Sequence, residues 1–151
     1  MKAIGTIVAV LLIGLGVAVF VVTRPPNREL DAEGRTWVRN YEAWVGTTER
    51  RIRKAEIGLG FSSAAKNAGL LEPLRTCSFS LARIGPPPEF LGSVEEAAIA
   101  ACGEAEHAVQ VNDRFGVASL ATTTLHLGEA DDRLRLSRRN MQVEIGETDE
   151  S

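Results

Sequence analysis

The chain has few aromatic residues and almost no segment in which polar and apolar residues alternate. Aromatic side chains make up 5% of its 151 residues, whereas alanine and glycine are plentiful. Half-buried strands need a period of two and favour β-branched and aromatic side chains, so this composition argues against a sheet core. We predict an all-α protein, with an N-terminal transmembrane helix followed by a small antiparallel bundle of about four helices with one disulfide.

Long runs of charge of one sign are also missing. The formal net charge is -3 and acidic and basic residues are interspersed, so we expect neither nucleic-acid binding nor a polybasic membrane patch. Lysine is scarce beside arginine, which is typical of a GC-rich bacterial genome. The sequence contains no CxxC, HExxH or CxxCH motif and no glycine-rich phosphate loop in a suitable context. We therefore predict no catalytic residues and no enzymatic activity.

One long hydrophobic run is present, near the N-terminus. Ala3–Val22 carries no charge, and at about 1.5 Å per residue it is long enough to cross a hydrocarbon core about 30 Å thick. Only Lys2 precedes it as a charged side chain and no A-x-A motif precedes Thr23, which favours an uncleaved anchor. The small residues Gly16 and Ala18 leave open an alternative, cleavage after Ala18 and secretion of a soluble domain.

The two cysteines decide on which side of the membrane the bundle lies. Positive charge does not fix the orientation, because Lys2 on one side competes with Arg24 and Arg28 on the other. A disulfide between Cys77 and Cys102 requires an oxidising compartment and so places the bulk of the chain outside the cytoplasm. The predicted organisation is a short cytoplasmic end (1–2), a transmembrane anchor (3–22), a linker (23–27), an extracytoplasmic bundle (28–141) and an acidic flexible tail (142–151).

The first bundle helix is predicted to begin after an N-cap at Asn27 and to end at Gly58. Its apolar residues recur at intervals of three and four, and Trp37, Tyr41 and Trp44 fall on one face as an aromatic stripe. Such a stripe could be an interaction surface, since large aromatics dominate interfaces. In a domain with so few aromatics, we interpret it as core. Residues 58–67 are predicted to be a connection.

The cysteines belong to a predicted helical hairpin. One helix should run from near Pro73 to Gly85, and the next should start at Ser93, which forms an S-x-x-E capping box with Glu96. With these bounds both cysteines lie about 12 to 14 Å from the turn. The two sulfur atoms are then level, and a bridge between Cys77 and Cys102 is feasible.

The last two helices carry the chain's two histidines. On the helix after Ser93, small residues repeat at steps of four and three, and the final helix has leucine or methionine at heptad intervals. Glu104 and His107 are spaced i,i+3, and His126 and Glu129 repeat this spacing in reverse order. Folding at a turn near residue 116 brings the four side chains level, as imidazole and carboxylate ligands suited to Fe, Mn or Zn. We interpret them as a solvated polar flank with His–Glu hydrogen bonds across the hairpin, and a metal site is the alternative.

These patterns favour a non-enzymatic role. We predict a membrane-anchored interaction or accessory subunit that needs no cofactor and presents a helical surface to an unidentified protein partner. A metal-binding or redox bundle built on Glu104, His107, His126 and Glu129 is the second hypothesis, with a transition metal as its cofactor. A secreted soluble domain is the third.

Overall fold

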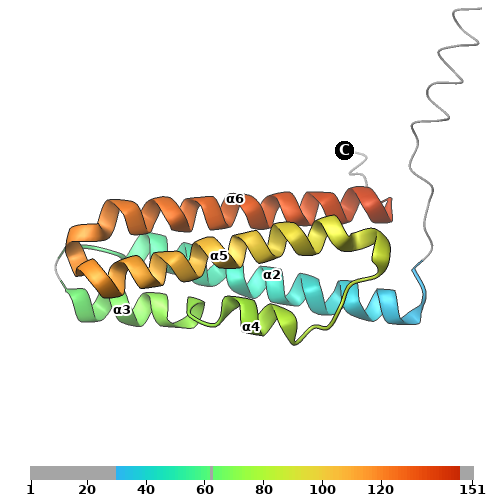
Figure 1. Ribbon diagram of the computed structural model, residues 1–151, viewed down its shortest axis with the longest axis horizontal. Helices are drawn as coiled ribbons and strands as arrows, with labels where there is room; N and C mark the ends of the chain where they lie inside the picture. Colours follow the sequence, from blue (N-terminus) through green and yellow to red (C-terminus); the bar gives the residue numbers. More distant parts are fainter. Residues whose placement is uncertain (1–29, 62, 147–151) are drawn as a thin grey trace, which may run out of the picture.

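The computed structural model describes residues 30–61 and 63–146, and within these ranges the protein is entirely helical (Figure 1). The all-α prediction is therefore confirmed for the described part of the chain. The α-helices are α2 (Ala32–Gly58), α3 (Ala64–Leu71), α4 (Cys77–Ala82), α5 (Gly92–Phe115) and α6 (Leu120–Ile145). Short 3₁₀ turns stand between them, namely η1 (Glu72–Leu74), η2 (Glu89–Leu91) and η3 (Gly116–Ser119).

The helices form an elongated antiparallel bundle. The long helices α2, α5 and α6 run along its full length, and α3 and α4 lie one after the other beside them (Figure 1). Three long helices and two short ones in series therefore take the place of the four helices expected.

Helix α2 begins later than predicted. Its N-cap is Asp31, whose side chain accepts a hydrogen bond from the Gly34 amide at 2.7 Å. A Cβ at Gly34 would lie 2.9 Å from Leu30 Cδ2 and 3.1 Å from Asp31 Oδ1, so glycine makes room for this cap. The predicted N-cap, Asn27, lies outside the described residues, and the helix starts at Ala32 because Asp31 satisfies its first free amide.

The aromatic stripe of α2 faces the core. Trp37 and Tyr41 are buried and their rings stack at 4.8 Å, while Trp44 is half-buried. Each tryptophan donates its indole N–H to the segment around α4, Trp37 to the Gly85 carbonyl at 3.0 Å and Trp44 to Ser80 Oγ at 2.9 Å. The stripe therefore holds α4 against α2, and it is not an exposed surface.

The predicted connection over residues 58–67 is wrong from Ala64 onward, where α3 begins. Ser63 caps α3 by accepting from the Lys66 amide at 3.2 Å. The buried Asn67 side chain accepts from the Gly60 amide at 3.1 Å and donates to the Gly60 carbonyl at 2.8 Å. Two hydrogen bonds from one amide side chain close this loop, so the polar sequence folds into a turn and a helix.

The second predicted helix is also interrupted. From Glu72 to Leu74 the chain forms a 3₁₀ turn, and α4 begins only at Cys77. Helix α5 begins at Gly92, one residue before the predicted start, with Leu91 at its N-cap and no side-chain cap. The predicted capping box of Ser93 and Glu96 is therefore wrong, because η2 leads the backbone directly into the helix.

The predicted disulfide is confirmed. Cys77, the first residue of α4, is bonded to Cys102 in the middle of α5, with a Cα–Cα distance of 5.2 Å. Both residues are buried, in the core cluster that also contains the Trp37 and Tyr41 side chains. The bridge thus covalently fixes the shortest helix to one of the longest.

Small side chains line the contact between α5 and α6. Ala98, Ala101, Ala105 and Ala108 of α5 are fully or almost fully buried. The facing positions of α6 include Leu127, Leu134 and Met141, as the heptad spacing predicts, whereas Leu120 is only half-buried at the helix start. Helix α6 continues to Ile145, so the predicted flexible tail is wrong at residues 142–145, and residues 147–151 lie outside the described part of the chain.

A buried hydrogen-bond chain joins three helices. Tyr41 of α2 is hydrogen-bonded to Ser137 of α6, which donates to the Val94 carbonyl of α5 at 2.5 Å. Burial raises the pKa of Tyr41 to about 12, and its hydrogen bond to Ser137 and the nearby Arg138 oppose this rise. Among the described residues, every buried side-chain nitrogen and oxygen has a hydrogen-bond partner.

The structure does not test the predicted anchor. The hydrophobic run 3–22 and the linker 23–27 lie outside the described residues. None of the helices described here has the length and hydropathy required to cross a bilayer.

Removing the disulfide should destabilise the bundle strongly. The bridge closes a sequence separation of 25 residues, and the chain-entropy model gives about 3.5 kcal/mol for such a loop. We expect the Cys77→Ala/Cys102→Ala protein to lose about that much free energy of unfolding in urea. Reduced wild-type protein is the matched control, and a loss below about 1 kcal/mol in both would contradict this role for the bridge.

Tyr41 should make stability fall at high pH. Its folded pKa is raised to about 12, against about 10 in an unfolded chain, so its contribution is complete below about pH 10 and is lost as the pH rises toward 12. Tyr41 is the single tyrosine, so phenolate absorbance follows this group alone. We expect Tyr41→Phe to cost about 1 kcal/mol at neutral pH and to flatten the alkaline decline. Titration near pH 10 in the folded protein would refute this.

Candidate metal centre

The α5–α6 hairpin brings the two histidines together. Glu104 and His107 lie one turn apart on α5, and His126 and Glu129 lie one turn apart on α6. The helices are joined by η3, where Gly116 adopts a positive φ of 56°, and they approach closely along the buried alanines of α5. The two i,i+3 pairs therefore stand beside one another, on the flank of the helix contact.

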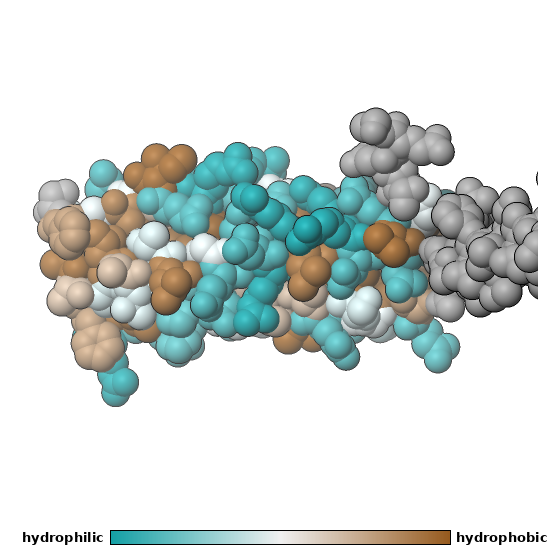
Figure 2. Space-filling view, turned by 90° about the horizontal axis from the view of Figure 1, so that it is seen from above, coloured by the Kyte–Doolittle hydropathy of each residue, from teal (hydrophilic) through white to brown (hydrophobic). Residues whose placement is uncertain are grey.

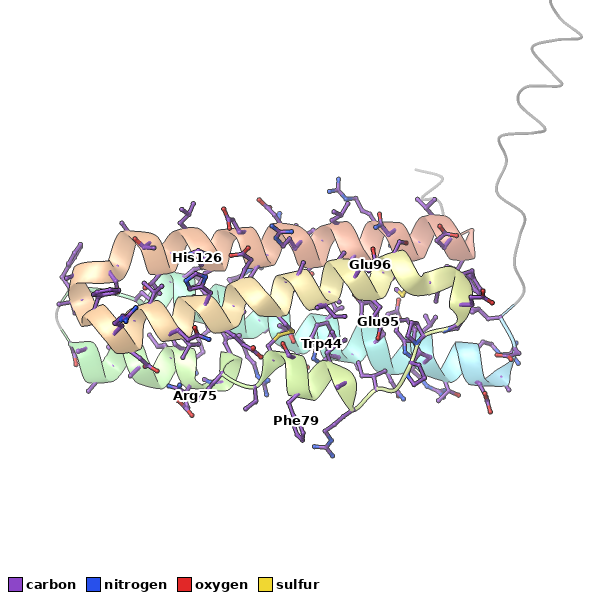
Figure 3. All side chains as sticks on the ribbon, in the orientation of Figure 1. Trp44, Arg75, Phe79, Glu95, Glu96 and His126 are labelled. Atoms are coloured by element: carbon purple, nitrogen blue, oxygen red, sulfur yellow. A yellow bond between two sulfur atoms is a disulfide. The ribbon has the colours of Figure 1, made fainter. Side chains whose placement is uncertain are left out.

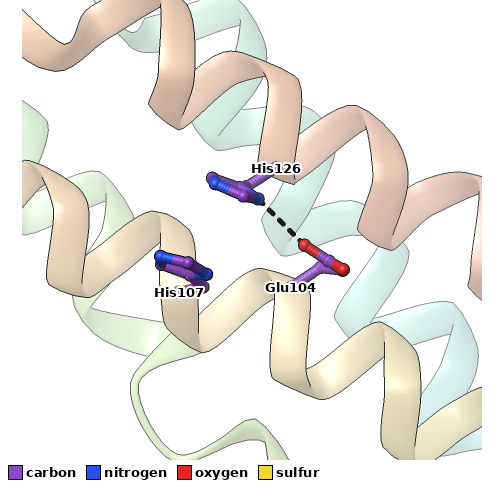
Figure 4. Close-up of side chains that lie close together, drawn as sticks. All are labelled: Glu104, His107 and His126. Atoms are coloured by element: carbon purple, nitrogen blue, oxygen red, sulfur yellow. Dashed lines mark hydrogen bonds and ion pairs between the residues drawn. The ribbon is translucent and has the colours of Figure 1, made fainter.

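The side chains from the two helices are in direct contact (Figure 4). The imidazole rings of His107 and His126 stack with centroids 4.3 Å apart and planes 20° from parallel. Nδ1 of His126 is hydrogen-bonded to Oε2 of Glu104 at 2.9 Å. Glu104, His107 and His126 each offer a ligand atom, and these three atoms lie within 4.8 Å of one another.

The fourth predicted ligand lies slightly farther away. Oε2 of Glu129 is 3.9 Å from Nδ1 of His126, and its side chain is 47% exposed. The structure therefore places three of the four predicted residues in one compact group and Glu129 at its edge. A di-iron site would need a second Glu-x-x-His motif and two more inward-facing glutamates. Among the described residues, only Glu104, His107 and His126 lie close enough together to be candidate ligands.

The carboxylate of Glu104 is stabilised in its charged form. The hydrogen bond with His126 lowers the pKa of Glu104, Glu129 and Arg133 act in the same direction, and burial opposes them. Nη2 of Arg133 lies 3.5 Å from Oε1, so the two oxygens of Glu104 face different partners. Glu104 thus carries a negative charge at neutral pH, and one of its oxygens is turned toward His126.

Arg133 also contacts this group, and the sequence analysis did not predict it as a site residue. It follows Glu129 by four residues and His126 by seven, so it stands on the same face of α6. This spacing was the available signal, because a residue seven positions after a ligand lies two turns further along the same helix face.

The site is open to solvent on one side. The side chains of Glu104 and His126 (the latter labelled in Figure 3) are 21% and 18% exposed, and His107 is more exposed than either. Two imidazoles and a carboxylate form a donor set typical of zinc or copper(II). The same groups, left without an ion, form a polar flank in which His126, Glu104 and Arg133 link α5 to α6.

Two other surface depressions in the described part of the chain offer little chemistry. One on α6 is lined by Asp132, Arg135, Arg138 and Arg139. Two of its arginines are already paired, Arg135 with Asp131 at 2.5 Å and Arg138 with Glu49 at 3.2 Å. Another lies beside Trp37 and the Gly85–Pro86 turn, where no histidine or cysteine is present.

No protein-family model, curated protein or solved structure matches this chain. The assignment of a function therefore depends on the residues of the chain itself and on the geometry described above.

Proposed function

We propose that the protein is a membrane-anchored, extracytoplasmic helical bundle that acts as a non-enzymatic interaction or accessory subunit. The observation that carries the proposal is a group of large apolar side chains exposed at one end of the bundle. The hydrophobic run, the disulfide and the apolar end each support one part of it.

The sequence supports the membrane anchor and the compartment. A charge-free run of residues 3–22 comes shortly before the first helix of the bundle, and a run of this length is typical of a transmembrane helix. The Cys77–Cys102 bridge supports an oxidising compartment, since structural disulfides persist outside the cytoplasm. The domain would then stand on the outer side of the membrane.

Of the eight large apolar residues exposed in the described part of the chain, four lie where α2 and α5 end and α6 begins (Figures 1 and 2). The other four are spread over α4, α5 and α6, namely Phe79, Ile99, Leu136 and Val143. Ile57 is 81% exposed, Phe61 79%, Phe115 58% and Leu125 60%. We call these four residues the distal cap. Single exposed apolar residues are common on protein surfaces, but several large ones at one end of a domain are typical of an interaction site.

A protein is a better occupant of the distal cap than lipid. The cap lies at the opposite end of α2 from residue 32 (Figure 1), and 27 residues of helix span about 40 Å. An anchor attached through residues 23–29 would enter the bundle at the other end. Two exposed phenylalanines are suited to filling pockets on an apolar protein surface, and Arg114, 5.7 Å from the Phe115 ring centroid, adds a polar rim.

Position-specific crosslinking in cells tests the proposal. A photo-crosslinking amino acid at Phe61 or Phe115 should yield a discrete adduct with another protein, identified by mass spectrometry. The same probe at Arg39, an exposed position of α2 far from the cap, is the matched control and should not. Ile57→Asp should abolish the adduct, because it places a charge in the contact. Recovery of monomer alone, of a dimer of this chain, or of lipid adducts would overturn the proposal.

The intact mass of the protein isolated from membranes tests the anchor. We expect the full chain of 16.3 kDa, lighter by two hydrogen atoms until reductant is added. A product that starts at residue 19 and is found in the medium would instead establish the secreted alternative. A mass unchanged by reductant would remove the argument for an oxidising compartment.

A further inference from the structure

We propose that Glu104, His107 and His126 bind one divalent transition-metal ion of the zinc or copper(II) class, which links α5 to α6. This inference is independent of the proposed interaction role, because none of its three residues belongs to the distal cap. It rests on the juxtaposition of the three side chains.

The first argument is the placement of the histidines. The chain has only two, and they come from different helices to stack at 4.3 Å. Neutral imidazole is the commonest nitrogen ligand for transition metals in proteins. Stacking leaves the ring edges free, and in Figure 4 one edge of each ring faces the Glu104 carboxylate.

The distances need only a small adjustment. A tetrahedral ion with bonds of 2.0 to 2.1 Å holds its ligand atoms about 3.4 Å apart. The three ligand atoms lie within 4.8 Å of one another, so side-chain rotations that move each atom by about 1 Å would bring them to the distances that an ion requires. His107 is exposed and Glu104 and His126 are partly exposed, so all three can make such rotations without disturbing the core.

Glu104 is already oriented for this task. Oε1 faces Arg133 at 3.5 Å and Oε2 contacts Nδ1 of His126 at 2.9 Å. The ion would replace the contact between Oε2 and His126, while Arg133 continues to hold the carboxylate through Oε1. Partners of this kind fix ligand orientation in metal sites. Because imidazole must be neutral to coordinate, binding should weaken as the pH falls.

Three protein ligands leave a position open. Glu129 of α6, the fourth predicted ligand, has its Oε2 atom 3.9 Å from Nδ1 of His126. Its exposure favours a weaker contribution than that of Glu104. Water or Glu129 can complete the coordination, and the relative effects of Glu104→Gln and Glu129→Gln distinguish the two.

The experiment uses the full chain in detergent micelles, purified without a histidine tag and freed of metal with a chelator. Titration with Zn²⁺ against a chromophoric competitor should show one saturable site per chain. We expect His107→Ala, His126→Ala and Glu104→Gln each to weaken binding at least tenfold, and Glu129→Gln to weaken it less. Glu96 is an exposed residue of α5, the helix that also carries Glu104 (Figure 3). The Glu96→Gln protein is therefore the matched control and should bind Zn²⁺ as the wild type does.

A second measurement reports the ligands directly. Electron paramagnetic resonance of the Cu²⁺ form should show coupling to two imidazole nitrogens, reduced to one in His107→Ala, while circular dichroism verifies that each variant stays helical. The proposal fails if the wild type shows no saturable binding up to about 1 mM Zn²⁺. It fails equally if the His107→Ala/His126→Ala protein binds as tightly as the wild type.

Discussion

The close contact between α5 and α6 is the constraint on which the rest of the bundle depends. Alanines at the interface let two backbones approach closely, and the long side chains of α6 then fill the space between α5 and α2. Both core clusters draw residues from these helices. The same approach brings His107 against His126, because side chains flanking an alanine contact have little space between them. A larger residue at Ala105 or Ala108 would separate the helices and the histidines together.

The fourth segment of the bundle is held by a few strong links. Helix α4 has only six residues, too few for independent helix formation in water. The Cys77–Cys102 bond fixes its start, and the indole N–H groups of Trp37 and Trp44 reach Gly85 and Ser80 near its end. The disulfide and these hydrogen bonds thus hold α4 in place, because its small apolar area stabilises its packing only weakly.

Periodicity predicted the parts of the structure that are long and regular. The buried heptad of α6 and the level placement of the two histidines follow from spacing, because helical rise is nearly constant. The end of α2 follows from glycine at position 58, and the disulfide from the similar distances of the two cysteines from the turn between their helices. The interruptions did not follow from it. The break before Cys77 and the short helix α3 depend on tertiary hydrogen bonds such as those of Asn67 with Gly60, which link residues across a turn and leave no periodic signal.

The predicted capping box at the start of α5 is wrong for a related reason. Ser93 and Glu96 match a capping box, yet η2 already supplies helical backbone before them, so no free helix terminus remains there to be capped. At the start of α2, Asp31 is the cap, and glycine at position 34 allows this cap to close. A capping motif therefore predicts a possible start, whereas the preceding backbone decides whether it is used.

The aromatic residues are distributed in an unusual way between core and surface. Trp37 and Tyr41, which carry polar atoms, are buried with those atoms hydrogen-bonded. Phe61, Phe79 and Phe115, which carry none, are exposed by 79%, 68% and 58%. Burying a phenylalanine stabilises a fold by roughly 1.5 to 3 kcal/mol, and this core is instead filled with alanine and leucine. Exposed phenylalanines add little to the stability of the fold, and two of these three, Phe61 and Phe115, belong to the distal cap on which the proposed function rests.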